Sequence, residues 1–236
     1  EDLRAYKSEW EVEQLKASAA LCDKAYDKML EAIKPGAYEF EVAAAGESIC
    51  RANGAHSFAY SCIVGSGARA KAVVPTATNR QMQDGELVMI GIAPRINGYA
   101  GTFGDTIPVN GVFTQRQKDL LNHMRETMRL TKDMLKPGMT GKEIDVPGRK
   151  YYEKHGLAEY IVCPFAHSIG LMEAEAPFFG PNGDFELAPG MLINVDVSFF
   201  GHPELYGGRI ETGFVITETG CDPLSPKLFD YFMKDL

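Results

Sequence analysis

The sequence contains little from which a membrane span or a nucleic-acid surface could be built. Its longest nearly unbroken apolar stretch, Leu87 to Ala93, is far shorter than the roughly 20 residues that a membrane-spanning helix needs. The 24 Lys and Arg residues are outnumbered by 32 Asp and Glu residues, which gives a net charge of −8, and they form no basic cluster. We therefore expect neither a membrane nor a nucleic acid as a partner.

Cysteine is scarce and scattered. The five cysteines form no C-x-x-C pair for zinc binding or redox chemistry, and their odd number does not suit a disulfide scaffold. The first residues are charged and do not resemble a signal peptide, so we expect reduced thiols and a cytoplasmic protein. With 236 residues, 45% of them hydrophobic, the chain can bury a core without such cross-links.

An internal repeat is the strongest organisational feature. Lys34-Pro35-Gly36 and Lys136-Pro137-Gly138 lie 102 residues apart, and so do Gly54 and Gly156, each at the end of a second helical segment. The repeat predicts one domain made of two halves of similar design, at about 8–112 and 113–236.

Each half opens with a long amphipathic segment that predicts a helix. In the first half, apolar residues recur at helical spacing from Leu15 to Ile33, and the helix ends before the proline that follows. In the second half, Thr114 forms a capping box with the residue three positions later, and Thr140 forms another with Glu143.

Short segments rich in Val, Ile, Phe and Tyr follow each helix pair, bounded by Gly or Pro. They predict strands at Phe58–Val64, Leu87–Ile92, Gly98–Val109, Ile161–Pro164, Leu192–Ser198 and Arg209–Thr217. This order predicts an α+β fold, with helices on one face of a curved, mainly antiparallel sheet. A second offset of 105 residues, from Gly91 to Asp196, places these two positions on equivalent strands that face one cleft.

Four motifs occur in an order and at a spacing that resemble one known family. They are Asn97-Gly98-Tyr99 with Asp105 to Val109, His167 to Leu171 with Glu175-Ala176-Pro177, Pro189-Gly190-Met191, and Gly208-Arg209-Ile210-Glu211. In these residues the chain resembles the pita-bread superfamily of methionine aminopeptidases, prolidases and creatinases. The resemblance covers nearly the whole chain and implies a pita-bread fold in one domain, residues 1–236.

The metallopeptidases of this family hold two divalent ions with two Asp, one His and two Glu. The resemblance places Gly91 and Thr102 where the two Asp would stand, His167 at the His, and Asp196 and Glu211 at the two Glu. Because glycine offers no ligand atom, we expect no bound metal and no other cofactor. One alternative stays open, a single metal held by the remaining His and two carboxylates.

The resemblance leaves a polar set in the cleft. We predict that His167, Glu175, Asp196 and Glu211 are catalytic, because carboxylates around a histidine raise its pKa and suit general acid and base chemistry near neutral pH. The alternative is a buried ion-pair network without chemistry. The two substrate histidines of the family fall on Val or Ala here, so its known mechanisms cannot simply be transferred.

Four further residues are candidates for substrate binding. Arg209 lies two residues before Glu211 on one strand, so both side chains share a face, and its guanidinium would bind a substrate carboxylate or pair with a neighbouring acidic residue. His56 precedes the strand that starts at Phe58, which in this fold reaches the cleft mouth, and His202 lies in the loop between two cleft strands.

Three functions follow from this set. The main prediction is a metal-independent, creatinase-like hydrolase that acts on a C–N bond of a small-molecule or short-peptide substrate bearing a carboxylate. The alternatives are a non-catalytic peptide- or ligand-binding pseudoenzyme and a one-metal peptidase of the aminopeptidase or prolidase type. The opening segment Leu3–Glu9 resembles the segment that follows an N-terminal domain in such proteins, so we expect that domain before Glu1, and a homodimer.

Overall fold

Three helices begin at side chains that cap their first turn. The computed structural model, which describes residues 2–236, contains α2 (Glu9–Ala32), α4 (Gln115–Asp133) and α5 (Gly141–Lys154). The hydroxyls of Ser8, Thr114 and Thr140 accept hydrogen bonds from the backbone three residues later, which satisfies amides that have no helical partner. The capping boxes predicted at Thr114 and Thr140 are confirmed.

The two Lys-Pro-Gly turns adopt the same backbone conformation. Gly36 follows α2 and Gly138 follows α4, and each has φ near +85°, a left-handed conformation that glycine adopts without strain. The chain then enters α3 (Glu39–Ala52) in the first half and α5 in the second. The helical remainder is short: α1 (Asp2–Ala5), α6 (Pro226–Phe232) and two 3-10 turns at Gly67–Lys71 and Ala158–Tyr160.

A seven-stranded antiparallel sheet forms the centre of the molecule. Its strands are β2 (Ile63–Ser66), β3 (Leu87–Ile92), β6 (Phe103–Pro108), β7 (Ala166–Ser168), β8 (Leu192–His202), β9 (Tyr206–Ile216) and β10 (Cys221–Pro223). Their order is β2-β3-β6-β9-β8-β7, with β10 added to β9. A small second sheet pairs β1 (Ser57–Phe58), β4 (Pro94–Ile96) and β5 (Tyr99–Ala100).

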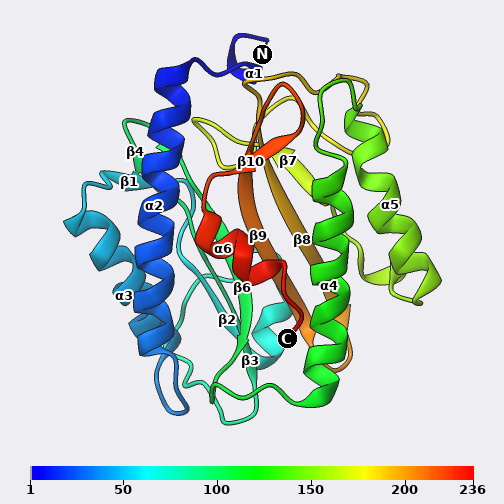
Figure 1. The fold of residues 1–236 in the computed structure, drawn as a ribbon. Helices are drawn as coiled ribbons and strands as arrows, with labels where there is room; N and C mark the ends of the chain where they lie inside the picture. The colour runs from blue at the N-terminus through cyan, green and yellow to red at the C-terminus, as the bar shows by residue number, and fades with distance from the viewer. Residues whose placement is uncertain (1) are drawn as a thin grey trace.

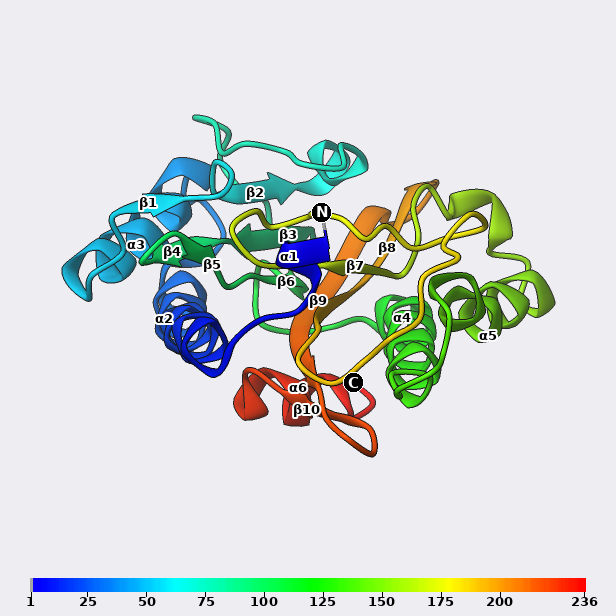
Figure 2. The same ribbon diagram turned by 90° about the horizontal axis from the view of Figure 1, so that it is seen from above.

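Helices cover one face of the central sheet. Figure 1 shows α2 and α4 on either side of the short α6. In Figure 2 these three helices lie below the strands, and α3 and α5 lie farther out. The segment after β2 arches over the opposite side of the sheet (Figure 2). The main buried core includes Met29 of α2, Met124 of α4, Phe103 of β6 and Phe214 of β9. The predicted α+β arrangement is confirmed.

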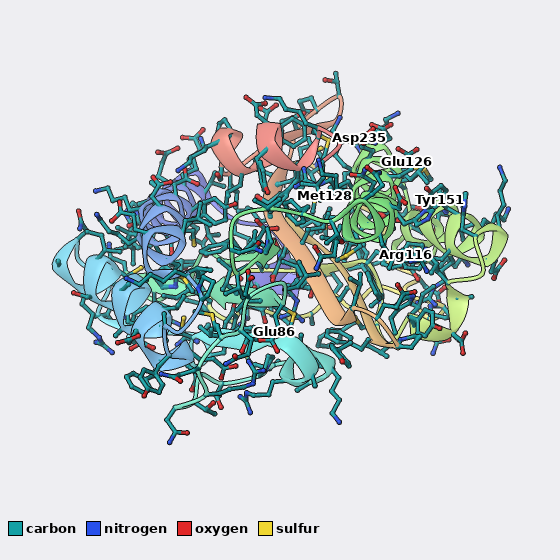
Figure 3. The ribbon with its side chains drawn as sticks, turned by 90° about the horizontal axis from the view of Figure 1, so that it is seen from below. Glu86, Arg116, Glu126, Met128, Tyr151 and Asp235 are labelled. Atoms are coloured by element: carbon teal, nitrogen blue, oxygen red, sulfur yellow. The ribbon has the colours of Figure 1, made fainter. Side chains whose placement is uncertain are left out.

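Residues 231–235, near the C-terminus, form hydrogen bonds and an ion pair with α4. Arg125, which is almost fully buried, donates to the backbone oxygens of Tyr231 and Lys234. Arg129 binds both Glu126 and Asp235, whose side chains come close together in Figure 3. The sequence patterns did not predict α6, because this helix of seven residues is too short to show a clear apolar period.

Three predicted strands differ from the structure. Ile161–Pro164 is irregular, and the strand lies instead at Ala166–Ser168, because the backbone N–H of Phe165 donates to Asp145 of α5 and Pro164 has no N–H to offer. Phe58–Val64 divides into β1 and β2, and Gly98–Val109 divides into β5 and β6. In each case the two strands belong to different sheets. Among residues 2–236, no helix combines the length and the apolar content needed to cross a bilayer.

Candidate functional site

A cavity of about 310 Å³ is lined by three of the predicted polar residues, His167, Asp196 and Arg209. It is bounded by strands β7, β8 and β9 and by the segments that hold Tyr60, Val73 and Phe178. Its charged lining groups are His167, Glu173, Asp196 and Arg209, and its other walls are mainly apolar. A larger cavity of about 450 Å³ lies between α2 and α6, but its charged lining residues, Asp27 and Lys227, pair with each other.

Strand register explains why the polar side chains converge. Asp196 on β8 pairs with Glu211 on β9, and Ser198 pairs with Arg209. Side chains alternate along a strand, so Asn194, Asp196 and Ser198 share one face of β8, as Arg209 and Glu211 share one face of β9. His167 on β7 pairs with Asn194, which places its imidazole beside the same face.

The imidazole of His167 lies between two carboxylates. Its Nε2 is 3.2 Å from Glu173 Oε1 and 3.8 Å from Glu211 Oε1. Burial alone lowers the pKa of His167, but hydrogen bonds and charge from the two glutamates outweigh burial and raise that pKa well above its usual value. Burial alone would raise the pKa of Glu173, but the hydrogen bond and the charge of His167 outweigh burial and lower that pKa below its usual value. At neutral pH the pair is therefore an imidazolium and a carboxylate.

Arg209 is the second buried cation of the site. Its Nε donates to Asp196 Oδ1 and to Ser198 Oγ, both at 3.1 Å, and lies 3.8 Å from Glu211 Oε2. Burial raises the pKa of the Asp196 carboxyl, and the charge of Arg209 opposes this rise. The terminal nitrogens Nη1 and Nη2 donate no hydrogen bond to any side chain or backbone group within residues 2–236, although Arg209 is only 6% exposed and lines the cavity.

Hydrogen-bond donors also surround Glu211. Its Oε1 accepts from Asn194 Nδ2 and, at 3.2 Å, from Thr102 Oγ1. The Thr102 hydroxyl is in turn 2.8 Å from the phenol oxygen of Tyr60. That phenol oxygen lies 3.5 Å from the point where a Cβ on Gly91 would stand, so Tyr60 occupies space beside the missing side chain.

The residues present do not fit a pair of divalent ions. The family resemblance implies five ligand side chains, and two of these positions hold Gly91 and Thr102, whose hydroxyl is already hydrogen-bonded. The carboxylates of Asp196 and Glu211 already accept hydrogen bonds from Arg209, Ser198, Asn194 and Thr102. The donor set therefore lacks the ligand number of a two-metal centre.

Glu175, predicted to be catalytic, belongs to a different ion pair. Its carboxylate binds Lys7 at 3.2 Å and also Arg4, both from the N-terminal segment, and accepts from the backbone N–H of Met172. It does not line the cavity. The acidic residue at His167 is Glu173, two positions earlier, and the irregular loop that carries both glutamates gave no periodicity from which to choose between them.

The three secondary candidates for substrate binding lie away from the cavity. His56 is exposed, and Phe58 packs under the guanidinium of Arg51 in the small sheet. His202 is 5% exposed, and its Nδ1 accepts from the backbone N–H groups of Glu204 and Leu205 at 3.1 and 3.3 Å. Turn geometry therefore explains His202, and packing explains Phe58.

Three residues of the site, Glu173, Asn194 and Tyr60, were not predicted from the sequence. Asn194 could have been found, because it lies two residues before Asp196 and strand alternation places both on one face. Tyr60 lies in the irregular segment between β1 and β2, where alternation does not apply.

Comparisons with known proteins agree with this architecture. The profile of metallopeptidase family M24 matches residues 13–218. The chain is 31% identical to a Xaa-Pro dipeptidase of Pyrococcus furiosus over 95% of its own length and 64% of that protein. A solved prolidase from Pyrococcus furiosus superposes with a TM-score of 0.90 over 94% of this chain and 66% of that one. A Xaa-Pro dipeptidase from Bacillus anthracis, also 31% identical, gives a TM-score of 0.90 and matching coverages of 96% and 64%. The pita-bread fold is confirmed.

The chain spans 62 to 64% of the length of the first curated relatives that it matches.

Proposed function

The chain belongs to metallopeptidase family M24, and on this premise we propose that it is a hydrolase of a C–N bond in a short peptide or N-acyl amino acid, working without a metal pair. The observation that carries the proposal is the pair formed by His167 and Glu173 at the cavity wall, an acid and a base 3.2 Å apart. Neighbouring groups whose environments separate their pKa values are typical of acid and base catalysis.

Arg209 would hold the substrate carboxylate. Arg209 lines the cavity, and its Nη1 and Nη2 are uncommitted within residues 2–236, so they can donate two parallel hydrogen bonds to a carboxylate. Apolar walls that include Ile63, Val73 and Phe178 would accept the side chains of a small peptide. The volume of about 310 Å³ suits a ligand of dipeptide size.

In the proposed reaction, Glu173 acts as base and His167 as acid. The Glu173 carboxylate takes a proton from a water molecule whose oxygen bonds to the carbonyl carbon of the substrate. The Nε2–H of His167 donates its proton to the leaving nitrogen as the C–N bond breaks. The proton on Glu173 then passes to His167 across 3.2 Å, which restores the starting state. Glu211, 3.8 Å from Nε2, and the backbone oxygen of Ser168, which accepts from Nδ1–H at 3.3 Å, hold the imidazolium in position.

Paired measurements of binding and turnover test this proposal. Xaa-Pro dipeptides and N-acyl amino acids are offered to the protein, with calorimetry for binding and detection of the released amine for turnover. We expect His167→Gln and Glu173→Gln each to lower turnover by about 100-fold or more while ligand binding persists. If wild type binds these ligands and never releases an amine, the chain is the non-catalytic binding module instead.

A second candidate, the one-metal peptidase, is favoured by one observation. Ligand atoms of His167, Glu173 and Glu211 lie within 4.8 Å of one another and could approach a single ion. The third ligand would then be Glu173, because Asp196 is held by Arg209 and Ser198. Turnover that requires an added divalent ion and stops with a chelator would favour this candidate, whereas the main proposal expects no effect of either.

We also propose a homodimer in the cytoplasm, with an N-terminal domain ahead of Glu1 in the full protein. The portion of the relatives that the chain leaves unmatched supports only the further domain. Light scattering on the full-length protein tests the dimer.

A further inference from the structure

We propose that His123 and His155 form a binding site for one Zn²⁺ ion, or a similar late first-row divalent ion, between α4 and α5. Neither histidine lines the cavity of the candidate site. The inference therefore does not depend on the proposed function, and it concerns ion binding rather than turnover.

The two histidines meet where α4 and α5 lie against each other. His123 is near the middle of α4, and His155 is the residue at which α5 ends. Their ring centroids are 4.8 Å apart, and the ring of Tyr151, labelled at this junction in Figure 3, lies 4.4 Å from that of His155. Two imidazoles, the commonest metal-binding side chain, are thereby held in contact by different helices.

Each imidazole has a ring nitrogen available to bind an ion. The Nδ1 of His123 is 2.9 Å from the Tyr151 hydroxyl, and within residues 2–236 its Nε2 has no hydrogen-bond partner. His155 is exposed and forms no side-chain hydrogen bond within the same residues. A metal-binding histidine usually donates its second ring N–H to an oxygen, and the Tyr151 hydroxyl is placed to accept that bond from His123 Nδ1.

The remaining ligands come from one carboxylate and from water. Asp119 lies one turn before His123 on α4, on the same helix face, and its Oδ1 accepts from Gln115 at 2.8 Å. In the part of the chain that the structure describes, the preformed cluster of three ligands is the one in the cleft. At His123 the third ligand must therefore rotate into place. Two imidazoles suit Zn²⁺, whereas Mg²⁺ prefers oxygen ligands alone.

An ion held by both histidines would join α5 to the core of the second half. Met124, next to His123 on α4, is fully buried, whereas α5 lies farther from the sheet (Figure 2). Because only the folded chain brings the two helices together, Zn²⁺ should raise the unfolding midpoint of the protein.

The test is calorimetry with Zn²⁺, and with Mg²⁺ as control ion, on wild type and three variants. We expect wild type to bind Zn²⁺ at this site with one ion per chain. Its affinity should fall at least about 100-fold in His155→Gln, which loses one of the two imidazoles, and about 10-fold in Tyr151→Phe, which loses the oxygen beside Nδ1. His167→Gln, which removes the imidazole of the cleft, should keep this ion, and Mg²⁺ should not replace it.

His155 is exposed at the end of a helix, so His155→Gln should fold. The rise of the unfolding midpoint with Zn²⁺ should disappear in this variant and persist in His167→Gln. Zn²⁺ binding that His155→Gln leaves unchanged would overturn the inference. If His167→Gln alone loses the ion, the inference is wrong and the one-metal candidate for the cleft gains support. Half an ion per chain with a Zn²⁺-dependent dimer in light scattering would also overturn it, because the ion would then join two chains.

Discussion

Glu39 shows how one buried carboxylate shapes a wall of the cleft. Its side chain is fully buried at the start of α3 and accepts hydrogen bonds from the backbone N–H and hydroxyl of both Ser66 and Thr78, and from Arg69 Nε. These partners lie at the two ends of the segment that carries Val73, a lining residue of the cavity. The position of that wall therefore depends on a residue outside the cavity.

Replacement of Glu39 by Ala should destabilise the protein by about 3 to 5 kcal/mol, because it leaves Arg69 and several buried donors without their acceptor. Urea unfolding monitored by circular dichroism measures this loss. Ser48→Ala, an exposed change on the same helix, is the control and should cost less than about 0.5 kcal/mol. A loss below about 1 kcal/mol for Glu39→Ala would contradict the role given to this carboxylate.

Asp105 on β6 joins the sheet to the helices that cover it. It is 1% exposed, accepts from the Tyr26 hydroxyl of α2 at 2.8 Å, and lies near the charge of Arg125 on α4. Burial raises the pKa of Asp105 to about 6, and Arg125 and the hydrogen bonds oppose this rise without cancelling it. The folded protein therefore holds a proton between about pH 4 and pH 6 that the unfolded chain releases.

Because the native state binds more protons in this range, the contribution of Asp105 to stability should fall as pH rises from about 4 to 6. A shift of this size corresponds to about 3 kcal/mol between pH 4 and pH 7. The measurement is the free energy of unfolding of wild type minus that of Asp105→Asn at several pH values, which cancels titration elsewhere. A difference that stays flat, or rises with pH, would show that this carboxyl does not carry the raised pKa.

Local patterns predicted the regular elements well and the loops poorly. The two capping boxes at Thr114 and Thr140 and the strands β3 and β6 depend on neighbouring residues, and all were expected at or near their observed positions. The misplaced strand before His167 depends on a hydrogen bond from Phe165 to Asp145, 20 residues earlier. No window of neighbouring residues contains that information.

In the candidate site, too, the residues on strands were predicted and those in loops were not. Asp196, Arg209 and Glu211 lie on long strands, where alternation and register bring them together as predicted. Glu173 was missed and Glu175 misassigned because both lie in the irregular segment after β7, whose course is decided by distant contacts. The N-terminal segment supplies those contacts, and the sequence carries no sign that Lys7 would reach this loop.

The N-terminal segment is bound across the molecule to the loop beside the cavity. The Lys7 ammonium is 3.2 Å from Glu175, and both side chains are nearly fully buried, while the Lys7 backbone N–H donates to Gly190 at 3.0 Å. Burial lowers the pKa of Lys7, and the charge of Glu175 opposes this fall. Arg4 adds a second, half-exposed cation to the same carboxylate. Two segments about 170 residues apart in sequence are thereby held together.

This arrangement predicts opposite effects for two glutamates that lie two residues apart. Glu175→Gln removes the charge that compensates the buried Lys7 and should lower the free energy of unfolding by about 3 kcal/mol. It should leave ligand binding and turnover within a few-fold of wild type, measured well below the unfolding midpoint, because Glu175 faces the N-terminal segment and not the cavity. Glu173→Gln, the matched variant, should cost little stability, because its side chain is 23% exposed, and should lower turnover about 100-fold while ligand binding persists, because it removes the base beside His167. Urea unfolding and calorimetry on both variants decide the question. If folded Glu175→Gln loses turnover as severely as Glu173→Gln, then Glu175 reaches the substrate, and the prediction that it is a catalytic residue is restored.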